Sequence, residues 1–196
     1  MLGTDLSKVD RQWPGSNLSF VQHDAEKDEW NFGRQFDYVH LRFVVSCFGD
    51  TKAVFQKAYD NMKPGGYIEL FDIEAVHKYM DGPASEAMDK WLDITLGAIA
   101  RIGGDLRKSV KYKTWLEEVG FVDVVDRLFK SPCNTWPKHP RLKELGTRQL
   151  VSFVAAAESI DKLVARSGID VQVINELRPK SNADMANTDY HAWMPM

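Results

Sequence analysis

Cysteine is scarce in this sequence. It contains two cysteines, Cys47 and Cys133, which lie far apart and form no CxxC pair. We therefore expect neither a disulfide framework nor a cysteine-ligated zinc site, and we expect a reducing compartment. The histidines and acidic residues show no HxxH or HExxH spacing either, so we expect no metal ion.

The sequence also lacks an excess of positive charge and any long apolar run. Its formal net charge is −3, whereas binding of DNA or RNA depends largely on neutralising phosphates with Lys and Arg. No apolar stretch approaches the roughly 18 residues of a membrane span, and the first residues do not resemble a signal peptide. We therefore expect no nucleic acid and no membrane as partners. The expected location is the cytoplasm, with the nucleus as the alternative.

What is present is the pattern of an α/β protein. The chain has 196 residues, of which 44% are hydrophobic, and no internal repeat, so we expect one domain over 1–196. Apolar, β-rich runs predict strands over residues 18–24, 36–45, 67–73 and 121–129. Apolar residues at helical spacing predict helices over residues 51–62, 88–102, 112–119 and 145–163. The motif Pro64-Gly65-Gly66 is expected to end the first helix.

These segments predict how the chain is organised. The order strand, helix, strand over 36–73 is a βαβ unit, and such units build parallel sheets. We expect a sheet core in 1–130 and a helical, substrate-side region with a tail in 131–196. The tail from Pro179 shows no period, so no element is expected there.

Polar residues follow three of the expected strands. In open parallel sheets, ligands bind beyond the carboxyl ends of the strands. Asp5 and Asp24 are expected at neighbouring strand ends, where one can accept ribose hydroxyls and the other an adenine amino group. His40 and Arg42 lie toward the end of a third strand. Asp is also common at strand ends as a turn former or helix cap, and this structural role stays open.

Five segments in order carry a resemblance to a known family. They read GTDLS, HDAEKDEW, FDYVHLRFV, KPGGYIELFDIE and YKTWLEEVGFVDV. Together they resemble the fungal class I S-adenosylmethionine-dependent methyltransferases, in the branch of secondary-metabolite pathways and of regulators associated with velvet proteins. The resemblance runs from Leu2 to about Lys143 and implies a three-layer α/β, Rossmann-like parallel sheet. It also implies that Asp5 binds the ribose, that Asp24 and Ala25 contact the adenine, and that His40 lies beneath the reactive end of the cofactor.

The resemblance stops at both ends of the chain. In that family, a segment before GTDLS supplies the first strand and a glycine-rich loop for the methionine half of the cofactor, and residues 190–195 resemble the approach to the last strand. We expect a sheet that lacks its first strand and its last, whose open edges favour strand exchange or a homodimer. A full-length methyltransferase or a velvet-type regulator is the alternative partner. A fragment of an ordinary enzyme is a third reading.

Several functions stay open at this point. Without that loop we favour a cofactor-free enzyme of natural-product biosynthesis, which cyclises or isomerises a small-molecule intermediate as a pericyclase does. Its pocket is expected to be lined by aromatic residues, namely Phe43, Phe48, Trp91, Trp115, Trp136 and Phe153. The alternatives are S-adenosylmethionine-dependent methylation of a small molecule, completed by another chain, and a non-catalytic partner subunit. Aromatic residues at these spacings are also typical of an ordinary core.

For proton transfer we favour His40, because an imidazole exchanges protons near neutral pH. Arg42 and Glu69 orient a polar substrate in this hypothesis. We rank His77 below His40, and a structural role for His40 on a buried strand stays an equal alternative.

Overall fold

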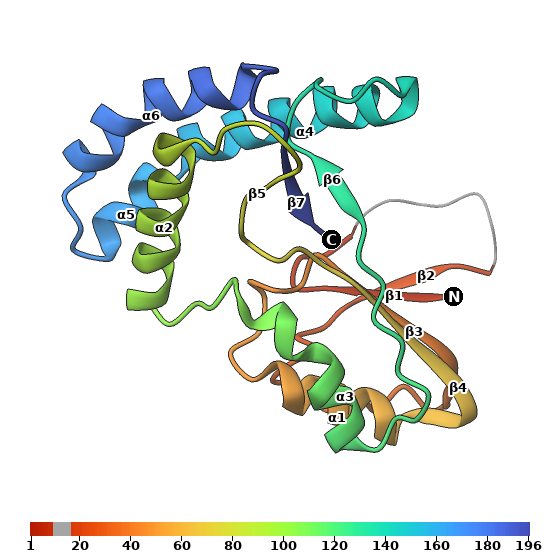
Figure 1. Cartoon of the computed structure of the whole chain (residues 1–196). Coiled ribbons are helices and arrows are strands. Elements are labelled where there is room, and N and C mark those ends of the chain that lie inside the picture. Colours follow the sequence, from red (N-terminus) through yellow and green to blue (C-terminus); the bar gives the residue numbers. More distant parts are fainter. Residues whose placement is uncertain (10–16) are drawn as a thin grey trace. The chain divides into compact units, whose positions relative to one another are not determined.

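The computed structural model describes residues 1–9 and 17–196. It is an α/β chain that forms two compact units (Figure 1). The first unit comprises Met1–Arg42, Cys47–Leu70 and Tyr112–Val124. The second comprises Phe43–Ser46, Phe71–Lys111 and Val125–Met196. The prediction of a single domain over 1–196 stays a prediction.

Three strands precede the first helix, and most of the helices lie in the second half of the chain. The strands are β1 Leu2–Asp5, β2 Ser19–Gln22, β3 Phe36–Arg42, β4 Met62–Phe71, β5 Lys78–Tyr79, β6 Lys130–Pro132 and β7 Ala192–Pro195. The helices are α1 Thr51–Asp60, α2 Glu86–Arg101, the 3₁₀ helix Lys108–Lys111, α3 Tyr112–Val119, α4 Pro140–Ser159, α5 Asp161–Arg166 and α6 Val171–Ala186.

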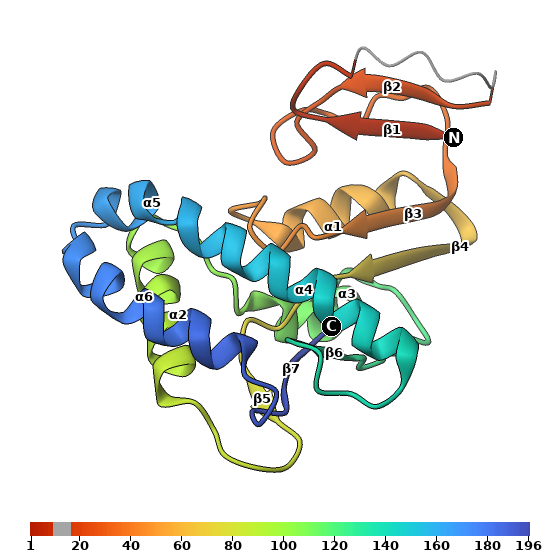
Figure 2. The ribbon, with the colours of Figure 1, turned by 90° about the horizontal axis from the view of Figure 1, so that it is seen from above.

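The strands of the first unit form two separate pairs. β1 and β2 are parallel, with Leu2 opposite Ser19 and Asp5 opposite Gln22. β3 pairs with β4, and the arrows of these two strands point the same way in Figure 2. The predicted βαβ unit is therefore confirmed as β3, α1 and β4. One continuous sheet was expected, but the described strands form three small sheets.

A helical layer covers one face of the β3–β4 pair. Asp50 begins α1 as its N-cap, because its side chain accepts a hydrogen bond from the backbone N–H of Ala53 at 2.9 Å. Phe55 of α1 is fully buried against α3 and against the sheet. The whole cluster consists of Phe55, Tyr112, Leu116 and Val119, with Leu41, Ile68, Leu70, Trp115, Phe121 and Val124 around it. The opposite face of the pair carries exposed side chains, including Tyr38 and Tyr67.

The second unit combines an antiparallel sheet with helices. β7 lies in the middle of this sheet, with Lys78 of β5 opposite Trp193 on one side and Pro132 of β6 opposite Trp193 on the other. One core cluster lies beside the sheet and contains Met88, Cys133, Met185, Ala192 and Met194. A second cluster holds α2, α5 and α6 together and contains Ala98, Val164 and Ile174.

A buried asparagine fixes the connection between α6 and β7. The Asn134 side chain is fully buried, and its Nδ2 donates to the carbonyls of Met185, Asn187 and Tyr190 at 3.0, 3.1 and 3.2 Å. Its Oδ1 accepts from the backbone N–H of Trp136 at 2.9 Å. These bonds satisfy the buried amide of Asn134, and they hold the chain where it turns from α6 into β7.

The expected strand over 121–129 is wrong. This segment has no strand pairing before its last residue, Phe129, which exchanges backbone hydrogen bonds with Met196 at 2.8 and 2.9 Å just before β6 begins, and Asp123 has a left-handed backbone with φ of 54°. Phe121 and Val124 pack beside the Phe55 cluster, but Val122 and Leu128 are 83% and 55% exposed, so the apolar residues do not form one buried strand face. A strand needs a hydrogen-bonding partner as well as a pattern.

Two further expectations about local structure are wrong. Helix α1 ends at Asp60, before Pro64-Gly65-Gly66, and this motif lies inside β4. The tail from Pro179 is also more regular than expected, because α6 continues through Pro179 and β7 follows it. Contacts distant in sequence explain the second error: Ser85 Oγ donates to the carboxylate of Asp184 at 2.7 Å and ties α6 to the start of α2.

Candidate functional site

Two carboxylates lie at the same end of the β1–β2 pair. Asp5 is the last residue of β1, and Asp24 follows β2 by two residues. The carbonyl of Asp5 accepts a hydrogen bond from the N–H of His23 at 2.9 Å, so the two strands remain paired up to this edge. Because the strands are parallel, this edge is the carboxyl end of both, where ligands bind in such sheets.

Each carboxylate also organises the turn that follows it. Asp5 Oδ1 accepts from the N–H of Ser7 at 2.8 Å. Asp24 Oδ1 accepts from the N–H groups of Glu26 and Lys27 at 3.0 and 3.1 Å, and the bond from Lys27 is the main reason why the pKa of Asp24 is lowered. The structural alternative for both residues is therefore present. It engages one oxygen of each carboxylate, so the Oδ2 of Asp5, and the Oδ2 of Asp24 beside the largely exposed Lys27 ammonium, remain available to hydroxyl or amino donors of a ligand.

Ala25 contributes its backbone to the same edge. Its carbonyl accepts a hydrogen bond from Nε1 of Trp30 at 3.0 Å, which closes the turn over 24–30. The Lys27 ammonium lies 3.7 Å from Asp24 Oδ2 and is largely exposed, so it screens that carboxylate only weakly. The acidic run from Asp24 is thus a compact, hydrogen-bonded turn.

A second polar group lies on the uncovered face of the β3–β4 pair. His40 and Arg42 alternate with the half-buried Val39 and Leu41 along β3 and are both exposed. Tyr38 donates from its hydroxyl to Glu69 of β4, and its ring stacks on that of His40 with the centroids 6.1 Å apart. The bond to Glu69 raises the pKa of Tyr38. The structure therefore brings His40 and Glu69 together through Tyr38, which the sequence reasoning did not single out.

The six aromatic residues expected to share a pocket pack into different clusters. Within the first unit, Trp115 borders the core around Phe55. Within the second unit, Trp91 packs with Val164, whereas Phe153 packs with Met88. The others are Trp136, stacked on His191, Phe43, whose edge meets Phe71, and Phe48, which is half-buried. A shared aromatic pocket stays a prediction.

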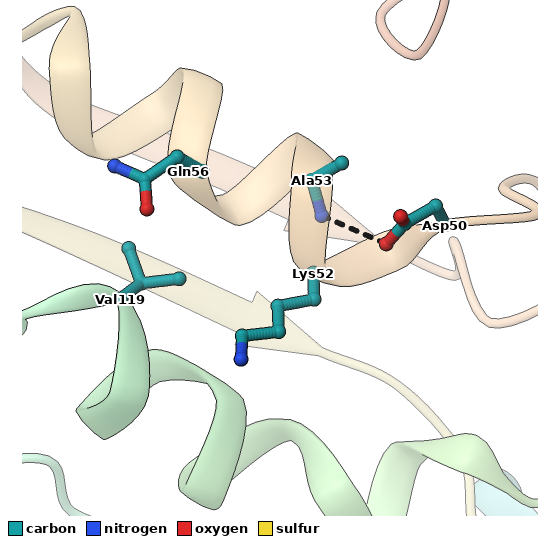
Figure 3. A pocket seen from close by; sticks show the side chains of 5 residues that line it. All are labelled: Asp50, Lys52, Ala53, Gln56 and Val119. Carbon is teal, nitrogen blue, oxygen red and sulfur yellow. Dashed lines mark hydrogen bonds between the residues drawn. The ribbon is translucent and has the colours of Figure 1, made fainter.

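Two surface cavities lie on the first unit, away from the paired acids. The smaller, of about 260 Å³, lies between α1 and the end of α3. Its two charged side chains are already engaged, because Asp50 caps α1 (Figure 3) and Lys52 bonds to Glu118 at 2.6 Å. The larger, of about 590 Å³, is lined by the first residues of β1 and β3, which include Leu2, Phe36 and Asp37. It therefore lies at the amino ends of these strands, opposite to the edge that carries Asp5 and Asp24.

The second unit contains a buried histidine in contact with a carboxylate. The side chain of His77 is 3% exposed, and its Nδ1 lies 3.2 Å from Asp89 Oδ1. The hydroxyl of Tyr79 donates to the same oxygen at 2.9 Å. Burial lowers the pKa of His77, and the Asp89 carboxylate opposes this effect without reversing it.

We expect this histidine to make folding stability depend on pH. The pKa of His77 is below 6.5 in the folded state, so the unfolded chain binds more protons just below pH 6.5. Stability should therefore fall as the pH falls through this window, by at most about 1.4 kcal/mol per pH unit. Urea unfolding at several pH values measures this slope. His77→Gln should flatten it, whereas His139→Gln, at an exposed position, should not; equal slopes in all three proteins would contradict the expectation.

Comparison with known proteins places the chain in a family. A family model described as a methyltransferase domain matches residues 1–125. The chain belongs to this family. The match spans both acid-bearing strands and the βαβ unit, and the expected class I methyltransferase-like α/β fold is confirmed at the level of fold class. In the part of the chain that the structure describes, no three His, Cys, Asp or Glu side chains are grouped to hold a metal ion.

The relatives of this methyltransferase-domain chain are fungal proteins. It is 32% identical over 161 residues to methyltransferase pytC of Aspergillus terreus, which covers 81% of this chain and 49% of pytC. It is 26% identical to the probable methyltransferase tdiE of Emericella nidulans, over 91% of this chain and 58% of tdiE. It is 29% identical to the secondary metabolism regulator LAE1 of Cochliobolus heterostrophus, over 74% of this chain and 49% of LAE1. The chain thus spans about half the length of these relatives.

A solved structure also aligns with the methyltransferase-domain chain. It is phosphoethanolamine N-methyltransferase 2 of Haemonchus contortus with S-adenosyl-L-methionine, at 20% identity and a TM-score of 0.38, over 91% of this chain and 36% of its own. None of the helices within residues 1–9 and 17–196 combines the length and the apolar character that crossing a membrane requires.

Proposed function

We propose that this chain carries the adenosine-binding edge of an S-adenosylmethionine-dependent methyltransferase that acts on a small molecule of fungal secondary metabolism. The observation that carries the proposal is the placement of Asp5 and Asp24 at the carboxyl ends of two parallel, hydrogen-bonded strands. Both residues lie in the part of the chain that matches the methyltransferase domain. The fungal methyltransferases among its relatives support the class of reaction.

The hydrogen-bond acceptors at this edge fit the adenosine half of the cofactor. Ribose hydroxyls and the adenine amino group are donors, and the Oδ2 atoms of Asp5 and Asp24 are charged acceptors, which form the stronger class of hydrogen bond. When bound, S-adenosylmethionine supplies an electrophilic methyl group. The residues of this chain contribute by holding the nucleoside in one orientation, and such positioning is the main demand of a direct group transfer.

The methionine half has no matching donor set among the described residues. In these ranges no glycine-rich turn leads from a strand into a helix N-terminus, the arrangement that suits a carboxylate. β1 and β3 each also have one edge that pairs with no described strand, and the cavity of about 590 Å³ touches the first residues of both. We propose that an extended segment of another chain, in a homodimer or a methyltransferase partner, pairs with these edges and completes the site.

The cofactor-free cyclisation predicted from the sequence is not the function that we propose. It requires the six aromatic side chains to line one cavity, and their distribution over separate clusters gives it no support. The non-catalytic partner subunit remains an outcome of the test below.

Isothermal titration with S-adenosylmethionine and S-adenosylhomocysteine tests the proposal. We expect Asp5→Asn and Asp24→Asn to weaken binding of both ligands by about tenfold or more, because each removes a charged acceptor from a polar contact. Asp126→Asn, at an exposed residue away from any strand end, is the matched control and should bind like the wild type. Light scattering on the same samples reports whether binding accompanies a dimer.

Two results would count against the proposal. Equal affinities in the three variants would remove Asp5 and Asp24 from the site. A well-folded chain that binds neither ligand, alone or as a dimer, would favour the non-catalytic subunit.

A further inference from the structure

A lysine of helix α1 is bonded to the turn that carries Asp24. Lys57 lies in the last turn of α1, and its side chain is half-buried. Its ammonium donates to the backbone carbonyls of Glu26 and Asp28 at 2.7 and 2.9 Å. Both partners belong to the turn that follows β2, and all of these residues lie in the first compact unit. The contact therefore joins α1 to the edge that we propose to bind adenosine.

The residues that Lys57 contacts also hold Asp24 in place. The N–H of Asp24 donates to the Asp28 carboxylate at 2.9 Å, and its carbonyl accepts from the N–H of Asp28 at 2.9 Å. The N–H of Glu26 donates to Asp24 Oδ1 at 3.0 Å. Fixing the carbonyls of Glu26 and Asp28 therefore also fixes the direction of Asp24 Oδ2, the oxygen that remains for a ligand.

A second bond ties the same turn to the start of α1. Glu26 Oε1 accepts from the N–H of Asp50, the N-cap of the helix, at 2.6 Å. A carboxylate is favourable at this end of a helix, and helical side chains lean toward it, so Lys57 reaches back along α1 to the turn. The helix is a firm support because Phe55 buries it against α3 and the sheet. Two separate bonds to one packed helix leave the turn little freedom to shift.

The charge of Lys57 suits this role. The turn has four carboxylates within six residues, and these like charges repel one another. Hydrogen bonds from a charged donor are stronger than those between neutral groups. Lys57 forms no ion pair with a carboxylate of the described residues, so it offsets the repulsion from the carbonyl side of the turn. The carboxylate oxygens of Asp24 are thereby left to other donors.

We propose that Lys57 is a positioning residue of the adenosine-binding edge, which fixes the turn after β2 so that the Asp24 carboxylate is directed at the ligand. The proposal rests on the proposed cofactor binding and deepens it by naming a residue that prepares the site. Lys57 acts through Asp24 and not by contact with the ligand, because its ammonium is engaged with the two carbonyls. The competing explanation is that Lys57 only adds to the stability of the first unit.

Isothermal titration with S-adenosylhomocysteine separates these explanations. We expect Lys57→Met to weaken binding by about threefold to tenfold, and by no more than Asp24→Asn does. The loss should shrink to within about twofold in an Asp24→Asn background, which has no Oδ2 to direct, and persist in full in an Asp5→Asn background. A loss that is equal in both backgrounds, or absent from the wild-type background, would overturn the proposal. Lys52→Met, on the same helix (Figure 3), breaks the bond to Glu118 instead and should bind like the wild type.

Hydrogen exchange without ligand keeps this proposal distinct from the proposed function. The N–H groups of Glu26 and Lys27 donate to Asp24 Oδ1, so their exchange reports whether the turn is fixed. Lys57→Met should speed the exchange of both amides by about tenfold or more, whereas Lys52→Met should not. Unchanged exchange in Lys57→Met would overturn the role of Lys57. A wild-type chain that binds no ligand would instead overturn the proposed function, while the exchange rates would still decide whether Lys57 fixes the turn.

Discussion

Gly146→Ala should destabilise the protein by at least about 3 kcal/mol, because the new methyl group has no space. A Cβ at this position of α4 would lie 1.8 Å from the carbonyl oxygen of Asn134. That carbonyl cannot move freely, since the side chain of Asn134 is bonded to three carbonyls and to the N–H of Trp136. Urea unfolding followed by circular dichroism measures the loss.

The chain offers a matched control for this substitution. Gly97 lies inside α2, and a Cβ added there meets nothing within 4 Å. Gly97→Ala should therefore stabilise the protein by about 0.5–1 kcal/mol, the usual difference between Gly and Ala in a helix interior. A Gly146→Ala protein as stable as the wild type would show that α4 does not approach Asn134 this closely.

Phe55→Ala should cost about 3–5 kcal/mol, the typical range for removing a buried phenylalanine. The side chain of Phe55 is fully buried, and its ring meets that of Tyr112 edge to face, with the centroids 5.3 Å apart. Residues of α1, α3, β3 and β4 surround it, and none can fill the space without leaving its own contacts. Chemical unfolding measures the cost, and hydrogen exchange locates the amides whose protection is lost.

Tyr67→Ala is the control for this prediction. Tyr67 lies on β4 and is 76% exposed, so its truncation should change stability by no more than about 0.5 kcal/mol. We expect the amides of β3, β4 and α1 to lose protection in Phe55→Ala before those of β5 and β7, because the two groups belong to different compact units. A loss below about 1 kcal/mol would contradict the central place of Phe55 in this core.

The elements that local signals determine could be predicted from the sequence. Helix α3 spans the predicted residues, and Gly120, with φ of 120°, ends it as a glycine at that position can. The start of α1 at Thr51 also agrees with the prediction, and its stabilising contact is local, because the Asp50 side chain accepts from an N–H three residues later. In each case the stabilising contact joins residues within one or two turns, so a short window of sequence contains it.

Elements that depend on distant partners could not be predicted in this way. The segment 121–129 has the composition of a strand, but among the described residues its backbone pairs with another strand only at its last residue, where Phe129 meets Met196 and β6 follows. Helix α6 contains Pro179 and little apolar periodicity, and its buried contacts reach α2, nearly 100 residues earlier. The order of apolar and polar residues within a segment does not indicate which distant segment it will contact.

The residues of the candidate site likewise differ in how far the sequence could predict their contacts. Asp5 and Asp24 follow apolar strands directly, so sequence order was enough to place them at one edge. The partner of His77, Asp89, lies twelve residues away on another element, so the sequence did not indicate this contact. A usable signal was present, since His77 and Tyr79 are two residues apart in a short β segment and thus share a face.

The central position of β7 has a consequence for the order in which the protein is made. β5 and β6 do not pair with each other and are joined only through β7, which follows β5 by about 110 residues. At ribosomal rates of about 5–20 residues per second, β5 waits roughly 6–22 seconds for its partner. Until β7 is made, the nascent chain exposes β5 and β6, which pair with it. It also exposes the apolar side of α2 that later packs beside Met194. Chaperones that bind extended apolar segments during translation therefore have their longest opportunity at this sheet.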